Sequence, residues 1–346
     1  MNVLLLSIGL PFIFGLACFL LPKEDRGLSP FFAVTASAIT SAACFKIFAL
    51  RPLSFNIGTI GCLWVDTLSG FVSIFIGLFS FLIVIYSMGF MKGRENLNKY
   101  YAYVLWTTAA SIGAAFANHL VIFLTFWGIL GITLYLLIAM GAEGAHASAK
   151  KTFIIIGASD ALLLLGIALL WKLSPVLEMS MIHVPLASSL ATLAFVCLAL
   201  AAFAKAGAMP LHTWIPDSAE TAPTPVMAFL PASLDKLLGI YFLFRISVGM
   251  FKIQPNSALS LFLIITGSIT IIAAVMMALV QHNLKKLLSY HAVSQVGYMV
   301  LGIGTANPIG IAGGLFHMLN HAIYKSCLFL SGGNVEQQTG TNDLSK

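Results

Sequence analysis

Long apolar stretches separated by short polar segments run through the whole sequence. With soft boundaries they cover residues 2–21, 31–50, 66–90, 100–117, 119–141, 149–172, 188–208, 226–248, 257–280, 289–306 and 309–332. A helix of about 20 apolar residues crosses the hydrocarbon core of a bilayer, so the pattern predicts about eleven transmembrane helices. A β-barrel is excluded because its strands alternate over about 10 residues, whereas these runs are continuous. We therefore expect an all-α polytopic membrane protein.

The longest early connection lies between the second and third runs, at residues 51–65. It alternates in polarity and contains Gly58 and Gly61, which predicts a small hairpin outside the bilayer. Asp66 comes directly afterwards, at the start of the third run. A negative charge at a helix N-terminus is favourable, so we expect Asp66 to cap this helix.

The seventh run leads into a segment that is rich in proline. This segment contains Gly207, Pro210, Pro216, Pro223, Pro225 and Pro231. Proline removes a backbone donor and clashes with the preceding turn of a helix. The freed backbone groups are tolerated at membrane depth only beside protein or water, and broken helices of this kind mark ion and substrate sites in transporters. The sequence therefore predicts that helix 7 is broken beside a site.

Composition agrees with a membrane protein and excludes several other classes. Of the 346 residues, 59% are hydrophobic and only 9% are charged, against about 25% charged in soluble domains. A soluble enzyme, a secreted disulfide scaffold and a disordered chain are thereby excluded. The formal net charge of +6 comes from cations that lie mainly in loops, so we interpret it as membrane topology and expect no nucleic-acid partner.

The loop cations also predict an orientation. The side on which helix 1 ends carries nine of them, and the opposite loops and flanks carry four, Arg51, Lys172, Arg245 and Lys252. Cytoplasmic loops hold the excess of Lys and Arg, so the N-terminus is expected outside. The N-terminal stretch lacks a basic segment and a clear cleavage site, which predicts a retained first helix rather than a cleaved signal.

Cysteine usage argues against bound redox centres in this chain. None of the five cysteines forms a C-x-x-C pair, and four lie in apolar runs. Iron–sulfur clusters and structural zinc sites need clustered thiolates. We therefore expect this chain to hold no metal and no cofactor of its own.

Ionisable residues inside apolar helices are the strongest functional signal, because burying a charge is expensive. Lys205 lies five residues before Pro210, beside the predicted break. A desolvated lysine with a movable carboxylate partner forms a proton switch, although the same pair can also hold helices together. Asp160 interrupts the sixth run and needs a partner, for which Lys205 or Lys236 is the obvious choice.

Two further groups complete the predicted pathway. Asp235 and Lys236 are adjacent, so they project about 100° apart on a helix. We place Lys236 on the pathway, and for Asp235 both a pathway role and a structural role stay open. His317, His321 and Lys325 recur every four residues and form one polar stripe on helix 11. The stripe can relay protons. A two-histidine zinc site and a buried hydrogen-bonded histidine pair are the competing interpretations.

Other ionisable residues are treated more simply. Lys46 lies near a helix end and is expected to extend its amine to the interface. His119 and His282 lie at loop edges, where solvation explains them. His291, just inside helix 10, stays open.

Several stretches of the chain resemble one family. They are FAKAGAMPLHTWIPDSAETAPTPVMAFLPASLDKLLGIYFLFR around Lys205, NLKKLLSYHAVSQVGYMVLGIG, GLFHMLNHAIYKSCLFLSGG, and VDTLSGF near Asp66. Together they resemble the antiporter-like membrane subunits of respiratory complex I, membrane-bound hydrogenases and Mrp-type cation/proton antiporters. The resemblance extends over essentially the whole chain.

The resemblance implies a water-filled axis that passes protons at the bilayer midplane. Lys205 matches the family's lysine in the broken helix, and Lys236 matches the helix 8 lysine that links the half-channels. Asp160 matches an acidic position seen in some members, and the residues of the helix 11 stripe match a relay. The implied function is a proton-translocating, non-redox subunit of a redox-driven complex, of the NADH:quinone oxidoreductase or hydrogenase type.

The resemblance also implies partners and a location. Other membrane and peripheral subunits are expected, and iron–sulfur clusters, flavin or a NiFe centre are expected only in those subunits. The prokaryotic cytoplasmic membrane is the expected location. An Mrp-type Na⁺/H⁺ antiporter subunit and a non-conducting structural subunit are the alternatives.

Two departures from the family pattern bear on function. The family carries a glutamate directly after Phe-Trp on helix 5, where this chain has Phe126, Trp127 and Gly128. We expect either that Asp160 substitutes or that the switch is disabled. The family is also built from two inverted five-helix repeats. By that plan residues 1–99 hold helices 1–3, residues 100–250 the first repeat, and residues 251–346 only part of the second, so the rest of the pathway is expected from further sequence or another polypeptide.

Overall fold

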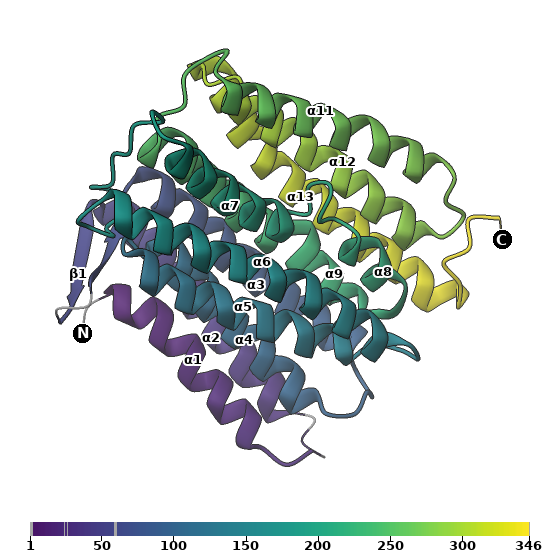
Figure 1. Ribbon diagram of the computed structural model, residues 1–346. Helices are drawn as coiled ribbons and strands as arrows, with labels where there is room; N and C mark the ends of the chain where they lie inside the picture. Colours follow the sequence, from purple (N-terminus) through teal and green to yellow (C-terminus); the bar gives the residue numbers. More distant parts are fainter. Residues whose placement is uncertain (1–2, 24, 26, 59–60, 346) are drawn as a thin grey trace. The chain divides into compact units, whose positions relative to one another are not determined.

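The computed structural model describes residues 3–23, 25, 27–58 and 61–345, and these are mostly helical (Figure 1). The chain divides into two compact units, Met1–Gly141 and Ala142–Lys346. Each unit is described by itself. The division falls between α5 and α6, and all the predicted pathway residues belong to the second unit.

The first unit contains five long helices and one hairpin. They are α1 (Val3–Leu20), α2 (Leu28–Leu50), β1 (Leu53–Ile57), β2 (Gly61–Val65), α3 (Thr67–Phe90), α4 (Leu97–Phe116) and α5 (Leu120–Ala139). Helix α4 packs against α1, α3 and α5, and α2 packs between α1 and α3. Hydroxyl groups reinforce this packing where α3 meets α4, through a contact of Ser80 with Thr108 and a 2.7 Å hydrogen bond between Ser87 and Tyr100.

The predicted hairpin and helix cap are both confirmed. Strands β1 and β2 pair antiparallel, with Leu53 opposite Val65. The Asp66 carboxylate accepts a 2.8 Å hydrogen bond from the backbone N–H of Ser69, and the Ser69 hydroxyl in turn accepts from the Asp66 N–H at 2.9 Å. This reciprocal pair satisfies backbone donors at the start of α3, which is why the helix begins there.

The second unit contains the remaining helices. They are α6 (Ala145–Leu173), α7 (Ser189–Ala206), α8 (Trp214–Thr221), α9 (Thr224–Phe229), the π-helix η1 (Leu230–Leu234), α10 (Asp235–Phe244), the π-helix η2 (Arg245–Met250), α11 (Ala258–Leu279), α12 (Leu284–Gly304) and α13 (Pro308–Thr339). Helix α7 packs against α6 and α10, and α12 packs between α11 and α13.

Within the described residues, eight helical segments are long and apolar enough to cross a membrane. Thr224–Met250 is one of them. Its most apolar stretch is fully buried, and the segment is made of α9, η1, α10 and η2 in succession. Helices α4, α12 and α13 overlap the other three predicted runs but are not among the eight. The number eleven therefore stays a prediction, while the polytopic helical architecture is confirmed.

Glycines permit a close contact between α11 and α12 in the second unit. A Cβ atom built on Gly267 of α11 would lie 2.7 Å from the carbonyl oxygen of Gly297 on α12, and one on Gly297 would lie 2.5 Å from the carbonyl oxygen of Gly267. Neither position can hold a side chain unless the backbones move apart. Small residues of this kind are what allow helices in membranes to approach closely.

Candidate functional site

Lys205 lies in the last turn of α7, where the chain leaves the helix. Gly207 follows in the left-handed conformation, with φ of 84°, and its N–H bonds to the Phe203 carbonyl at 2.7 Å. A glycine cap of this type ends a helix at little steric cost. The next helix, α8, begins at Trp214. The break within helix 7 stays a prediction.

The Lys205 ammonium faces a carboxylate inside the protein. Its Nζ atom lies 3.9 Å from Oδ1 of Asp235, and the two side chains are 0% and 1% exposed. Asp235 is the first residue of α10, so this contact joins the end of one helix to the start of another. Two opposite charges held this deeply avoid the larger penalty of either charge buried alone.

Lys236 makes a different contact from its neighbour. It is fully buried, and its Nζ donates a 3.2 Å hydrogen bond to the carbonyl oxygen of Ala206. The last carbonyls of a helix carry partial negative charge, so the C-terminal end of α7 is a favourable partner for an ammonium group. The side chains of Asp235 and Lys236 thus both contact the end of α7. Asp235 contacts the Lys205 side chain, and Lys236 contacts the backbone carbonyl of Ala206.

A π-helix directly precedes these two residues. Segment η1 contains Pro231, which lacks a backbone donor, and the N–H of Asp235 bonds to the carbonyl of Leu230. The Ser233 hydroxyl donates to the Ala228 carbonyl oxygen at 3.0 Å. Insertions of this kind rotate the residues that follow relative to an ideal helix, and they occur frequently at functional sites.

Helix α13 contacts the end of α9, next to η1, through Ser326. The Ser326 hydroxyl donates a 2.9 Å hydrogen bond to the Ala228 carbonyl oxygen, next to η1. Lys325 is 1% exposed, and it lies close enough to Lys236 for the charges of the two amines to interact. The structure therefore brings the predicted helix 8 lysine and the predicted helix 11 relay into one cluster.

The polar stripe on α13 is continuous. His317 is half-buried and His321 is fully buried, and their ring centroids lie 6.5 Å apart. Tyr298 of α12 packs edge-on against His317 at 5.7 Å. Among the described residues, no three His, Cys, Asp or Glu side chains are arranged to hold a metal ion. The donor set therefore offers no support for the zinc interpretation.

Two further positions singled out in the sequence are Asp160 and Gly128. Asp160 is half-buried on α6, the helix that packs against α7. Gly128 lies on α5 in the first unit, and a Cβ atom built there would meet nothing within 4 Å. The family glutamate is thus replaced by a residue that leaves room for a side chain.

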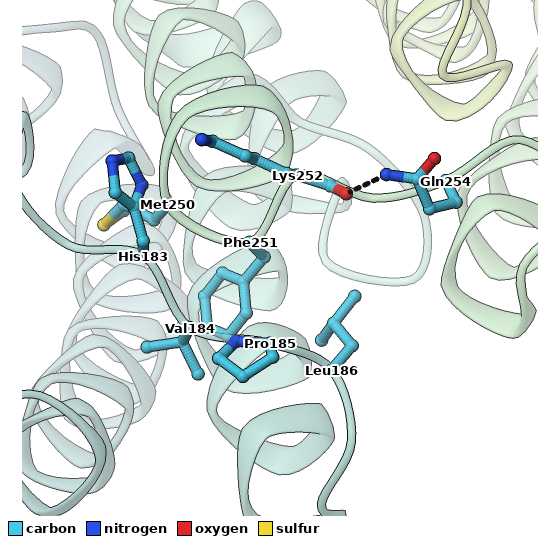
Figure 2. Close-up of a pocket in the computed structure, with 8 residues that line it drawn as sticks. All are labelled: His183, Val184, Pro185, Leu186, Met250, Phe251, Lys252 and Gln254. Carbon is cyan, nitrogen blue, oxygen red and sulfur yellow. Dashed lines mark hydrogen bonds between the residues drawn. The ribbon is translucent and has the colours of Figure 1, made fainter.

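Two surface cavities of about 380 Å³ each open on the second unit. The first lies between the residues before α7 and the end of η2, and Figure 2 shows the Lys252 side chain extending toward His183 there, with apolar residues beneath. None of the predicted pathway residues lines it. The second is lined by Gln295, Tyr298, His317 and glycines of α12 and α13, so it reaches the polar stripe from outside.

Sequence reasoning found the charged residues but missed part of their arrangement. The sequence pairs Asp160 with Lys205 or Lys236, whereas the carboxylate that the structure places at Lys205 is Asp235. The available signal was that both are isolated charges of opposite sign in apolar helices. His291 was left open, and its Nδ1 is a buried atom with no hydrogen-bond partner in the described part of the chain.

Comparison with known proteins gives a consistent match. Residues 117–346 match the family described as "NADH:quinone oxidoreductase/Mrp antiporter, TM", and residues 55–101 match the one described as "NADH-Ubiquinone oxidoreductase (complex I), chain 5 N-terminus". The chain is 34% identical to the chloroplastic NAD(P)H-quinone oxidoreductase subunit 5 of Zygnema circumcarinatum over 80% of its own length and 40% of the relative's. It is 32% identical to Na(+)/H(+) antiporter subunit A1 of Staphylococcus haemolyticus, over 82% of its length and 37% of the relative's.

A solved structure extends the match to the fold. A chain of the archaeal membrane-bound sulfane sulfur reductase, a respiratory membrane complex, superimposes with a TM-score of 0.89 at 26% identity. The match covers 100% of this chain and 73% of the other. This chain thus spans less than half the length of the curated relatives and about three quarters of the solved one.

Proposed function

Because this chain belongs to the NADH:quinone oxidoreductase/Mrp antiporter transmembrane family, we propose that it is the proton-translocating subunit of a redox-driven membrane complex. The observation that carries the proposal is the buried contact of Lys205 with Asp235, 3.9 Å apart at the interruption after α7. Lys236 and Lys325 continue this polar cluster toward the α13 stripe. Such a set of titratable groups is too expensive to bury without a function that uses it.

The axis works by shifting charge from one site to the next. When Asp235 is ionised, it stabilises the protonated form of Lys205, and loss of that interaction favours release of the lysine proton. A proton that leaves Lys205 toward Lys236 changes the charge near Lys325 in turn. Each elementary charge moved across the membrane requires about 2.3 kcal/mol per 100 mV, which the partner's redox chemistry must supply.

The chain acts as an integral membrane protein within a larger assembly. Its relatives include subunits of NAD(P)H-quinone oxidoreductase, a Na(+)/H(+) antiporter and a respiratory membrane complex. In our proposal, partner subunits hold the iron–sulfur clusters, flavin or NiFe centre, and this chain holds none. The excess of loop cations on one side supports an N-terminus outside a prokaryotic cytoplasmic membrane.

Two alternatives each have an observation in their favour. The 32% identity to Na(+)/H(+) antiporter subunit A1 supports exchange of Na⁺ for H⁺ without a redox partner. Gly128 in place of the family glutamate supports a structural subunit that does not conduct. Asp160 on α6 is the carboxylate we propose as the substitute, because α6 packs against the helix that carries Lys205.

The proposal is tested by replacing Lys205 in the intact complex. Lys205→Ala should lower redox-driven proton uptake into inverted membrane vesicles by about a hundredfold, because it removes the central proton-carrying amine. Lys46→Ala is the matched control, since Lys46 also interrupts an apolar helix but is exposed. Electron transfer is measured in the same vesicles.

Each outcome distinguishes the three functions. Loss of proton uptake in Lys205→Ala with uptake preserved in Lys46→Ala supports a redox pump. Proton movement that requires Na⁺ and no electron donor supports the antiporter. Unchanged redox-driven uptake in Lys205→Ala contradicts conduction through this chain and leaves the structural role.

A further inference from the structure

The contacts between α12 and α13 fix which residues lie at the same level. A Cβ atom built on Gly332 of α13 would lie 3.2 Å from the Leu284 side chain at the start of α12. At the other end, one built on Gly302 of α12 would lie 3.0 Å from the Cα atom of Gly314 on α13. The two helices are therefore antiparallel and in register over most of their length.

This register sets His291 beside Lys325. Moving seven residues along α12 from Leu284 reaches His291, and moving seven residues back along α13 from Gly332 reaches Lys325. Because both helices rise about 1.5 Å per residue, the two positions lie at one level. At the other end Gly302 faces both Gly310 and Gly314, so the same alignment holds there to within about one helical turn.

Electrostatic proximity agrees with the register. His291 lies close enough to Lys325 and His317 for their charges to act on it, and it acts in turn on His321. The ring is half-buried, and its Nδ1 atom is enclosed with no hydrogen-bond partner among the described side chains and backbone groups. Both ring nitrogens of His321 and the Nε2 atom of His317 share this condition.

Histidine nitrogens enclosed in this way are unusual when the ring serves only packing. Buried polar atoms in proteins are nearly always satisfied by protein groups or by ordered water. These histidine nitrogens lie on two facing helices. An imidazole ring accepts a proton at one nitrogen and releases a proton from the other, so such rings can pass protons between them. The set differs from a metal site, since no three potential ligands are arranged to hold an ion within the described chain.

We propose that His291 is a further proton-carrying residue, which extends the α13 stripe onto α12 and exchanges protons with Lys325. The His291 imidazole takes up the proton that the Lys325 ammonium releases, directly or through water, and the imidazolium passes it on. At this level the polar axis is thus formed by residues of two facing helices, α12 and α13, and not by the α13 stripe alone. This inference rests on the proposed function, because it needs protons to move along the stripe.

The test replaces His291 in the assembled complex and measures redox-driven proton uptake together with electron transfer. His291→Gln keeps a polar side chain of similar size but cannot take up a proton. We expect at least about a tenfold loss of proton uptake, with normal assembly. His282→Gln is the matched control, because His282 is exposed in the loop before the same helix and should behave as the wild type.

A second variant separates proton transfer from packing. His291→Ala removes the ring, and added imidazole should restore part of the lost proton uptake, whereas pyrrole, which has a similar ring but does not take up a proton near neutral pH, should not. Wild-type uptake in His291→Gln, or equal effects of imidazole and pyrrole on His291→Ala, would overturn the inference. The Lys205→Ala variant is measured in parallel: if it also pumps normally, the proposed function itself fails, and if it alone fails to pump, only the role of His291 is wrong.

Discussion

The carboxylate of Asp235 lies 3.9 Å from the Lys205 ammonium, and both side chains are withdrawn from solvent. This N–O distance is longer than that of a hydrogen bond, so the two groups attract each other as charges without a direct hydrogen bond. A buried ion pair without a direct hydrogen bond contributes little to stability, because desolvation of the two charges offsets their attraction. It is suited to a site at which one of the charges must change.

Asp235→Asn is expected to disable the axis without unfolding the protein. The amide keeps the shape and hydrogen-bonding capacity of the side chain but cannot stabilise a charged Lys205 through opposite charge. Redox-driven proton uptake should fall by about tenfold or more while electron transfer continues. Proton uptake and electron transfer measured in the same vesicles check this, and wild-type uptake would show that Asp235 has only a structural role.

Lys236→Met tests the neighbouring amine. Methionine preserves most of the apolar volume but removes the ammonium and its 3.2 Å hydrogen bond to the Ala206 carbonyl. We expect loss of proton uptake with a change of no more than about 1–2 kcal/mol in the free energy of unfolding, because a buried charge and its partner contact disappear together. Lys286→Met, on the partly exposed start of α12, serves as the control. A large loss of thermal stability with retained uptake would contradict the assignment.

At this scale the sequence predicts which residues matter better than it predicts their partners. Lys205, Lys236 and the α13 stripe stand out because they interrupt apolar runs. Pairing depends on how α7 meets α10 and on the rotation introduced by η1, and neither leaves a mark in hydropathy. Asp160 was expected to partner Lys205 or Lys236, and that expectation stays a prediction beside the observed contact of Asp235.

At the scale of elements, most of the helices are predicted by the apolar runs, and capping residues indicate where a helix begins. The hairpin followed from alternation and glycines in residues 51–65, and the start of α3 followed from Asp66. The short helix α8 and the π-helices η1 and η2 were not foreseen. Hydrophobic periodicity measures which face of a helix is apolar. Segment η1 is buried at all five residues, so it shows no apolar face, and α8 and η2 are only eight and six residues long, too short for a clear period.

The crossing of α11 and α12 yields a prediction about packing. Gly297→Ala should destabilise the second unit by about 1–3 kcal/mol or more, because the added methyl group would meet the Gly267 carbonyl oxygen at 2.5 Å and only movement of the backbone can relieve it. Gly157→Ala on α6 is the control, since a Cβ atom there meets nothing within 4 Å. Alanine is the better helix former, so the control should be neutral or slightly stabilising.

Thermal unfolding of the purified complex in mild detergent checks this pair of variants. A lower midpoint for Gly297→Ala with an unchanged or higher midpoint for Gly157→Ala is the expected result. Equal midpoints for the two variants would show that the α11–α12 contact does not limit stability.

At the scale of the whole molecule, charge is distributed in two distinct ways. The buried charges of the axis lie inside the second unit, and a separate group of ion pairs joins the helix ends of that unit. Lys286 of α12 binds Glu220 of α8 at 3.2 Å, and Lys151 of α6 contacts Asp217 of α8. These lysines belong to the side that loop counting predicts to be cytoplasmic, so the cations used to predict the orientation also contact α8.

Glu336 is the most enclosed acid of this end group and joins three helices. Its carboxylate lies 2.9 Å from the Lys285 Nζ atom of α12 and accepts a 3.0 Å hydrogen bond from the Thr224 hydroxyl of α9. Burial alone would raise the pKa of Glu336, but the Lys285 ammonium and hydrogen bonds from Lys285, Asn342 and Thr224 hold it below its usual range. The carboxylate is therefore more acidic in the folded chain than in the unfolded one.

Glu336→Gln is consequently expected to lower stability in a pH-dependent way. A lowered pKa in the folded state contributes stability above the unfolded value of about 4.3, and that contribution is lost as the pH falls through the folded pKa. The variant should lose about 1–3 kcal/mol near neutral pH, and its difference from the wild type should shrink on acidification. Thermal unfolding midpoints between about pH 6 and pH 3, a range that includes the unfolded pKa and extends below it, measure this, with the exposed Glu143→Gln as the control. A difference that stays constant across this range would mean that Glu336 acts through packing, and that the charges at the helix ends do not tie α9, α12 and α13 together.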